Sequence, residues 1–116
     1  MGIINENRRS KRVNLSLFAE LKFADKNLNG FIENVSENGI FKKVFSDVEV
    51  QGFIPGINVG VNFMLPSDDI IDLQCKIKWL NMNSQQFSEI MYNVGMEIIE
   101  PPNAYLKFVN NLYKHC

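Results

Sequence analysis

Alternation of apolar and polar residues, the pattern of a β-strand with one buried face, dominates the chain. It is clearest over residues 13–23, where Val13, Leu15 and Leu17 begin a regular apolar series. Phe18 is the exception, because it is apolar on the otherwise polar side of that segment. The pattern predicts six strands, over residues 13–23, 31–35, 40–45, 58–65, 71–79 and 90–98.

The segments between these strands are rich in residues that favour turns. Residues 25–30 predict a hairpin loop, 34–39 a second turn and 81–86 a polar turn, whereas 46–57 predicts an irregular connection. Connections this short join antiparallel neighbours. We therefore expect consecutive strands to pair with each other.

Pro101 and Pro102 end the sheet pattern, since proline cannot donate a hydrogen bond to a strand ladder. From Asn103, which is suited to capping a helix, the apolar spacing becomes helical. The predicted helix face holds Tyr105, Leu106, Phe108, Val109, Leu112 and Tyr113. The fold class predicted is all-β: a six-stranded antiparallel β-barrel with a C-terminal α-helix, whose closure leaves no exposed sheet edge.

At 116 residues the chain is long enough for one domain with one core. We expect residues 1–12 to form a flexible N-terminal segment and residues 13–116 to form the barrel with its helix. A formal net charge of −1 excludes a globally basic nucleic-acid binder, although a local anion site remains compatible with it.

Few residues of the kinds that bind metals or form disulfides are present. The chain has one histidine, His115, and two cysteines, Cys75 and Cys116. Their number and spacing favour reduced thiols in a cytoplasmic protein and predict no metal site. The start of the chain lacks the pattern of a signal peptide, and the uncharged residues 50–67 contain too many glycines, prolines and asparagines for a membrane helix.

All three arginines, Arg8, Arg9 and Arg12, lie within five residues, at the entry to the first predicted strand. A guanidinium is planar and permanently charged, and it can hold a phosphate or the edge of guanine with two parallel hydrogen bonds. The cluster therefore favours a planar anionic ligand. A solvated basic tail is the alternative.

A polar segment, Asn34-Val35-Ser36-Glu37-Asn38-Gly39, joins the second and third predicted strands. The Asn34 amide can pair with a base edge, the Ser36 hydroxyl can donate to a phosphate, and Gly39 allows a positive φ and close approach of a ligand. The alternative is an ordinary turn of the Asx type, without a ligand.

Arg-x-x-x-Arg before the first strand, followed by Asn-x-Ser-x-x-Gly after the second, resembles the PilZ domain family, bacterial receptors for cyclic di-GMP. The resemblance covers residues 8 to about 114. Lys76-Ile77-Lys78-Trp79 is similar to a late valine-x-tryptophan strand of that family, and Asn93-Val94-Gly95-Met96-Glu97-Ile98 is similar to its last strand.

The resemblance implies roles for the residues of both motifs. Arg8 and Arg12 would bind phosphate and stack on or hydrogen-bond guanine, and Arg9 is a further candidate. Asn34 and Ser36 would contact a guanine and its neighbouring backbone, and Gly39 would permit close approach. Asn34 stands where the family more often has aspartate, a stronger acceptor for guanine donors, so affinity could be lower.

Other residues have two interpretations each. Trp79 shares the parity of Ile71, Leu73, Cys75 and Ile77, which favours the core over contact with a ligand, and Cys75 is expected to be inert. The carboxylates of residues 68–72 favour a solvated strand entry over a metal site. Lys42 and Lys43 either extend the positive patch or decorate an edge strand.

The function implied is a non-catalytic, single-domain cyclic di-GMP receptor, without a cofactor, that relays the signal to an unidentified protein partner. The alternative is a PilZ-like interaction adaptor that binds no nucleotide. A small enzyme lacks support, since no pair of nucleophile and base is evident. A barrel that binds single-stranded nucleic acid would need exposed aromatic residues interleaved with basic ones, and the sequence has no such stripe.

Overall fold

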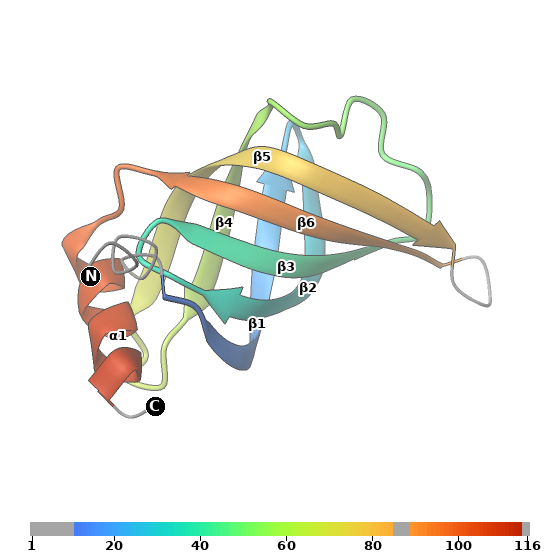
Figure 1. Ribbon diagram of the computed structural model, residues 1–116. Helices are drawn as coiled ribbons and strands as arrows, with labels where there is room; N and C mark the ends of the chain where they lie inside the picture. The colour runs from blue at the N-terminus through green and yellow to red at the C-terminus, as the bar shows by residue number, and fades with distance from the viewer. Residues whose placement is uncertain (1–10, 85–88, 115–116) are drawn as a thin grey trace.

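The computed structural model describes residues 11–84 and 89–114, which form an antiparallel barrel with one helix (Figure 1). The elements are β1 (Val13–Phe23), β2 (Lys26–Val35), β3 (Gly39–Ser46), β4 (Asn58–Met64), β5 (Ile70–Ser84), β6 (Ile90–Ile99) and α1 (Asn103–Lys114). The barrel closes in the order β1-β2-β3-β6-β5-β4, which confirms the predicted fold class. Arg8, Arg9 and most of the segment predicted to be flexible lie outside the described residues.

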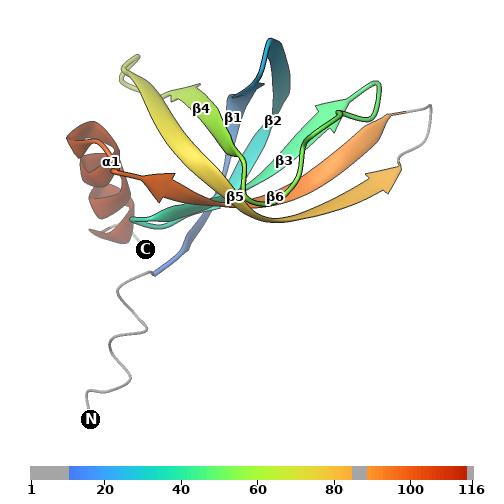
Figure 2. The same ribbon diagram turned by 90° about the horizontal axis from the view of Figure 1, so that it is seen from above.

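The inward side chains of all six strands form the core, as the alternation predicts. Cys75 lies in this core, and burial raises the pKa of its thiol to about 12, so it stays protonated and unreactive at neutral pH. The helix α1 lies at one end of the barrel (Figure 2). Its Tyr105 and Val109 are fully buried there, and Phe108 contacts Phe63 of β4 with 6.0 Å between ring centroids.

Two predicted loops are shorter in the structure because their polar residues belong to strands. The β1–β2 turn contains only Ala24 and Asp25, with Ala24 at a φ of 57°, and β2 already begins at Lys26. Asn27 and Asn29 are exposed. The sequence therefore predicted a loop where these asparagines are solvent-facing residues of a strand. At the same end of the barrel, β5 extends to Ser84, although residues 81–86 were expected to turn.

The expectation that Trp79 lies in the core is wrong, because a β-bulge changes the parity of β5. The pairing of β5 with β6 shifts register between Ile77 and Trp79. Ile77 is fully buried, whereas Trp79 is 45% exposed. An extra residue at a bulge moves the following side chains to the other face of the sheet.

Lys42 also departs from its expected place, since it points into the barrel. It shares the inward parity of Ile40 and Val44, and its side chain is fully buried. Its Nζ donates a hydrogen bond of 2.8 Å to the backbone oxygen of Ala19 on β1. Burial lowers the pKa of Lys42 to about 7, although nearby Glu20 acts in the opposite direction. Lys42 therefore extends no positive surface, and β3 is not an edge strand.

Within the described residues, no helix is both long and apolar enough to cross a membrane.

Candidate functional site

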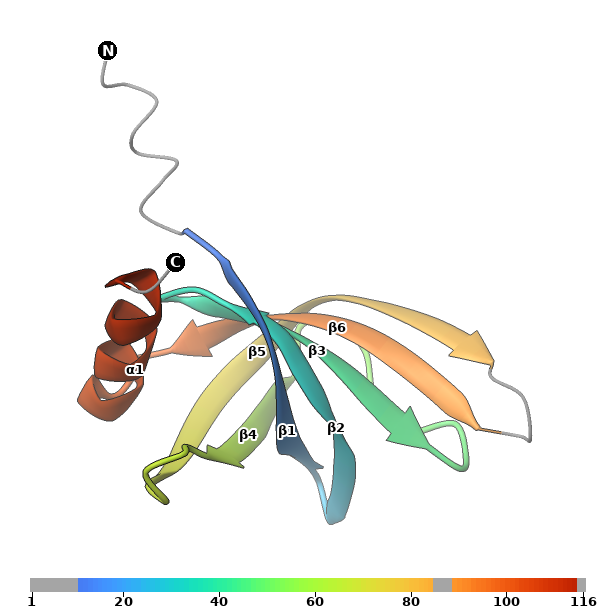
Figure 3. The same cartoon turned by 90° about the horizontal axis from the view of Figure 1, so that it is seen from below.

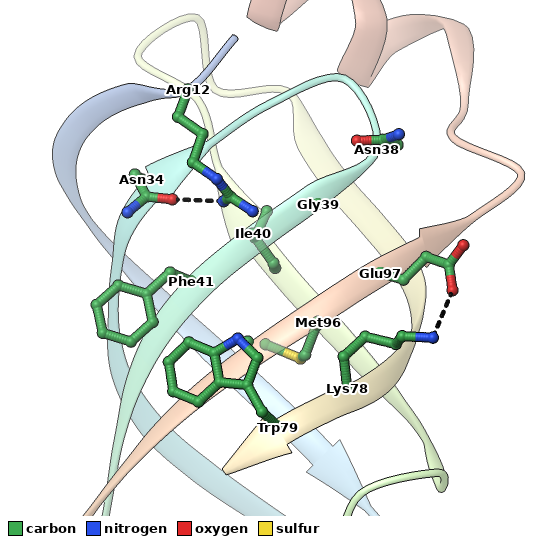
Figure 4. A pocket seen from close by; sticks show the side chains of 11 residues that line it. Arg12, Asn34, Asn38, Gly39, Ile40, Phe41, Lys78, Trp79, Met96 and Glu97 are labelled. Carbon is green, nitrogen blue, oxygen red and sulfur yellow. Dashed lines mark hydrogen bonds and ion pairs between the residues drawn. The ribbon is translucent and has the colours of Figure 1, made fainter. Parts of the chain in front are cut away.

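The two sequence motifs meet in space through Arg12 and Asn34. Arg12 immediately precedes β1, and Asn34 lies near the end of β2, which pairs with β1. Nη1 of Arg12 donates a hydrogen bond of 2.9 Å to Oδ1 of Asn34 (Figure 4). The antiparallel β1–β2 hairpin thus brings together two side chains that are 22 residues apart in the sequence.

This contact lies at a cavity of about 600 Å³ over the outer face of the barrel. The size is typical of a small-molecule site. The cavity is lined by Arg12, Asn34, Asn38, Gly39, Ile40, Phe41, Lys78, Trp79, Gly95, Met96 and Glu97.

Ser36 stabilises the turn beside the cavity and does not line it. Its backbone N–H donates to the Gly39 oxygen at 2.9 Å, and its Oγ lies 3.3 Å from both the Gly39 oxygen and Oδ1 of Asn38. The residue is almost completely buried. A direct contact of Ser36 with a ligand therefore stays a prediction.

Gly39 is needed for space and not for a positive φ, which corrects one reason given for it from the sequence. The described glycines with positive φ are Gly52 and Gly56. A Cβ on Gly39 would lie 3.1 Å from the backbone oxygen of Met96 and 3.9 Å from Nη2 of Arg12. A side chain here would crowd β6 and approach the Arg12 guanidinium.

An aromatic pair forms the wall of the cavity opposite Arg12. Phe41 of β3 and Trp79 of β5 both pair in register with Gly95 of β6, the strand between them. The two rings stack with 5.5 Å between centroids and an interplanar angle of 26° (Figure 4). The Trp79 indole occupies the position that a Cβ of Gly95 would take. The missing side chain therefore lets the two rings meet across β6.

Sequence reasoning missed this wall, although two signals for it were present. A glycine within a strand can mark close approach of another group, and Gly95 lies in the middle of β6. Trp79 and Leu80 are consecutive large apolar residues, which breaks the alternation where the bulge occurs. Together they indicate that Trp79 lies outside the core.

The described charged groups at the cavity are few and exposed. Lys78 pairs with Glu97 at 3.7 Å, and both side chains are more than half exposed. Such a pair contributes little to stability, so Lys78 can exchange Glu97 for another anion at small cost. The Arg12 guanidinium is the second cation of this cavity.

The helix α1 is hydrogen-bonded to the two segments that carry the sequence motifs, the one before β1 and the turn between β2 and β3. The hydroxyl of Tyr105 donates to the backbone oxygen of Ser36 at 2.6 Å, and that of Tyr113 donates to the backbone oxygen of Lys11 at 2.7 Å. Nζ of Lys11 also lies 5.7 Å from the centre of the Tyr113 ring. Burial raises the pKa of both tyrosines, so both hydroxyls keep their protons and donate at neutral pH.

Of the residues predicted for the site, the structure brings Arg12, Asn34 and Gly39 to one cavity and puts Ser36 directly behind it. Arg8 and Arg9 lie outside the described residues. Within residues 11–84 and 89–114, no group of three or more His, Cys, Asp or Glu residues could hold a metal ion, and this range includes the carboxylates of 68–72.

A family model for the PilZ domain matches residues 6–113, nearly the whole chain and both motifs. No curated protein matches the sequence.

Among solved structures, the barrel is similar to the PilZ domain with c-di-GMP of YcgR from Escherichia coli. The identity is 10% and the TM-score 0.70, with 93% of this chain and 92% of that chain covered. The inhibitor of motility MotI (DgrA) of Bacillus subtilis is 16% identical with a TM-score of 0.64, and MrkH of K. pneumonia in its apo state is 13% identical with a TM-score of 0.61. Each match covers 93% of this chain but only 51% of MotI and 49% of MrkH. At these identities the likeness establishes a shared fold.

Proposed function

Because the chain belongs to the PilZ domain family, we propose that it is a non-catalytic receptor domain for cyclic di-GMP. The ligand occupies the cavity between Arg12 and the Trp79–Phe41 pair, and the bound state is passed to a protein partner. The PilZ domain of YcgR, which shares the fold, has been solved with c-di-GMP.

The observation that carries the proposal is the hydrogen bond between Arg12 and Asn34 at the mouth of the cavity. It uses one guanidinium nitrogen and the amide oxygen. The other guanidinium N–H groups remain to donate to a phosphate. The second lone pair of the Asn34 amide oxygen remains to accept from guanine N–H groups. The pair thus presents hydrogen-bonding groups for the two chemical parts of a guanine nucleotide.

The Trp79–Phe41 wall suits the flat part of such a ligand. Trp79 is 45% exposed and lines the cavity, so its ring offers a face on which a purine can stack. Stacking of a base on an aromatic side chain contributes about 1–3 kcal/mol. A wall for the base opposite a cation for the phosphate is the arrangement that a cyclic dinucleotide needs.

The remaining motif residues have supporting roles in this proposal. Arg8 and Arg9 add guanidinium groups for the second phosphate and the second guanine. Ser36 holds the turn closed through the Gly39 oxygen, and Gly39 leaves room for the ligand over β3. Asn34 in place of aspartate weakens the grip on guanine N1 and N2, because an amide oxygen is a weaker acceptor than a carboxylate.

Calorimetric titration with cyclic di-GMP tests the proposal, with GTP and cyclic AMP as comparison ligands. We expect cyclic di-GMP alone to bind tightly. Arg12→Ala should weaken it by about 10- to 100-fold, because charge-assisted hydrogen bonds contribute about 1.5–3 kcal/mol each.

Lys22→Ala is the matched control, since Lys22 is an exposed cation of β1, the strand that follows Arg12, and does not line the cavity. It should leave the affinity unchanged. Absence of any heat with cyclic di-GMP at millimolar concentration would leave the alternative, an adaptor that binds protein partners without nucleotide.

A further inference from the structure

Four exposed apolar side chains form a row across four neighbouring strands. They are Phe31 of β2, Phe18 of β1, Met64 of β4 and Ile70 of β5, with exposed fractions of 40%, 56%, 53% and 65%. Phe18 pairs with Phe31 in register, and their rings meet edge to face at 5.8 Å between centroids. Met64 pairs with Ile70. We call these four residues the apolar row.

The middle of the apolar row is hollow. Strands β1 and β4 pair only through Glu20–Lys22 and Gly60–Asn62. Beyond this short ladder a groove of about 380 Å³ opens between the strands, lined by Leu17, Phe18, Glu20, Asn62, Phe63, Met64 and Ile70. Figure 3 shows β4, β1 and β2 side by side along this part of the barrel.

Acidic residues border the apolar row on both sides. Two residues away along the same strands, and on the same outward face, Glu20, Asn62 and Asp72 pair in register. They form a polar row parallel to the apolar row. On the other side, the exposed Asp68 and Asp69 precede Ile70. Lys43, the register partner of Phe31, is a cation at the β2 end of the row. The acidic character therefore belongs to the part over β1, β4 and β5.

We propose that the apolar row is the docking surface for an amphipathic helix of a partner protein, with an apolar stripe flanked by lysine or arginine. The apolar stripe enters the groove between Phe18 and Met64, and the basic residues face Glu20 and Asp72. Four strands at their usual spacing span about 14 Å, which corresponds to about ten residues of helix. Helices commonly bind grooves of this kind through apolar anchors at every third or fourth residue.

Charge selects this occupant over two others. A second copy whose row runs in the same direction would bring acidic residues against the same acidic groups, and like charges in an interface cost affinity. A copy turned end for end would offer these acidic groups only Lys43 from the end of its row. An anionic membrane surface would be repelled for the same reason. A basic amphipathic helix matches this surface, because its apolar side chains pack on the apolar row and its basic side chains face the acidic residues on either side.

The position of the apolar row links it to the ligand cavity, a link that rests on the proposed function. Arg12 and Phe18 are six residues apart and are joined by the first part of β1, which contains a bulge between Asn14 and Leu17. Asn34 and Phe31 likewise belong to β2. A ligand held by Arg12 and Asn34 therefore acts on the two strands that carry half of the apolar row.

The test uses two synthetic 14-residue peptides with leucines in a stripe of helical spacing, one flanked by lysines and the other by glutamates. Binding of the fluorescently labelled peptides to the full chain is followed by anisotropy. We expect the lysine peptide to bind at least about tenfold more tightly than the glutamate peptide. Phe18→Ser should reduce its affinity about tenfold, and Glu20→Gln with Asp72→Asn should remove the preference for lysine.

Val48→Ser is the matched control, because Val48 is 59% exposed but lies outside the groove. Equal binding of both peptides, or equal effects of the Phe18 and Val48 variants, overturns the proposal. So does a dimer in sedimentation that Phe18→Ser dissociates, since a second copy then occupies the row. Calorimetry with cyclic di-GMP separates the two proposals, because Phe18→Ser should leave that affinity unchanged and peptide binding does not require the nucleotide.

Discussion

Phe41 and Trp79 come from strands that are not neighbours, and their rings stack above Gly95 of the strand between them. The contact depends on a bulge that turns Trp79 outward and on a glycine that leaves it room. The aromatic wall of the cavity is therefore determined by three strands together.

Gly95→Ala tests this dependence. The added Cβ occupies the position of the Trp79 indole, so we expect the ring to be displaced from Phe41 and the free energy of unfolding to fall by about 1–3 kcal/mol. Trp79 is the only tryptophan, so its fluorescence reports the displacement directly, and urea unfolding gives the stability. Gly60→Ala is the control, since a Cβ there meets nothing closer than 3.8 Å. Similar losses in both variants would contradict the role of Gly95.

Trp79 should also report binding of the ligand. If a guanine stacks on its exposed face, cyclic di-GMP will change the tryptophan emission, and Trp79→Ala will weaken binding by about 1–3 kcal/mol. Fluorescence titration of the wild type and calorimetry of the variant measure the two effects. Met82→Ala removes another exposed apolar side chain of β5, outside the cavity, and should bind normally. Unaltered affinity of Trp79→Ala would exclude stacking on this wall.

Asn34→Asp should strengthen binding several-fold, because the carboxylate accepts both from Arg12 and from guanine N–H groups more strongly than the amide does. Asn38→Asp adds the same charge to the lining of the cavity, at the turn and not on β2. It should weaken binding of the dianionic ligand by repulsion. Calorimetry of the two variants distinguishes a specific contact from a general charge effect, and a parallel loss in both would refute the contact.

Lys42 predicts a dependence of stability on pH. Its pKa is about 7 in the folded protein and near 10.5 when unfolded, so between these values the unfolded chain binds more protons. The contribution of Lys42 to the free energy of unfolding therefore increases between about pH 7 and about pH 10.5. Below about pH 7 this contribution is constant. Urea unfolding at several pH values should show this rise in the wild type.

Lys42→Met removes the titrating group and keeps an apolar side chain of similar length. In this variant, the contribution of Lys42 to the rise of the free energy of unfolding with pH should be lost. Lys43→Met, at the next and half-buried position, should retain it. Parallel curves for wild type and Lys42→Met would show that Lys42 stays charged inside the barrel.

The sequence predicts the barrel well because the inward side of each strand is apolar along most of its length, as in β4, where Val59, Val61 and Phe63 are all buried. The resemblance to the PilZ family implied that Arg12, Asn34 and Gly39 share a site, and they line one cavity in the structure because the β1–β2 hairpin brings the ends of its two strands together. Trp79 could not be placed by parity, because a single bulge reverses the faces of β5.

Lys42 was misplaced for a different reason. A lysine is expected at the surface, and only the structure reveals that the backbone oxygen of Ala19 gives its Nζ a buried partner and that Gly30, which has no side chain, leaves room for it. The β1–β2 loop was overestimated because Asn27 and Asn29 favour turns locally, whereas pairing with β1 keeps them in a strand.

The bonds from α1 to the two motif segments end on main-chain oxygens, those of Ser36 and Lys11. Every amino acid supplies such an oxygen, so replacement of the side chain at either position keeps the acceptor. These two hydrogen bonds are thereby independent of which side chains stand at positions 36 and 11. Side chains at these two positions can therefore differ between members of the family while both tyrosine hydrogen bonds persist.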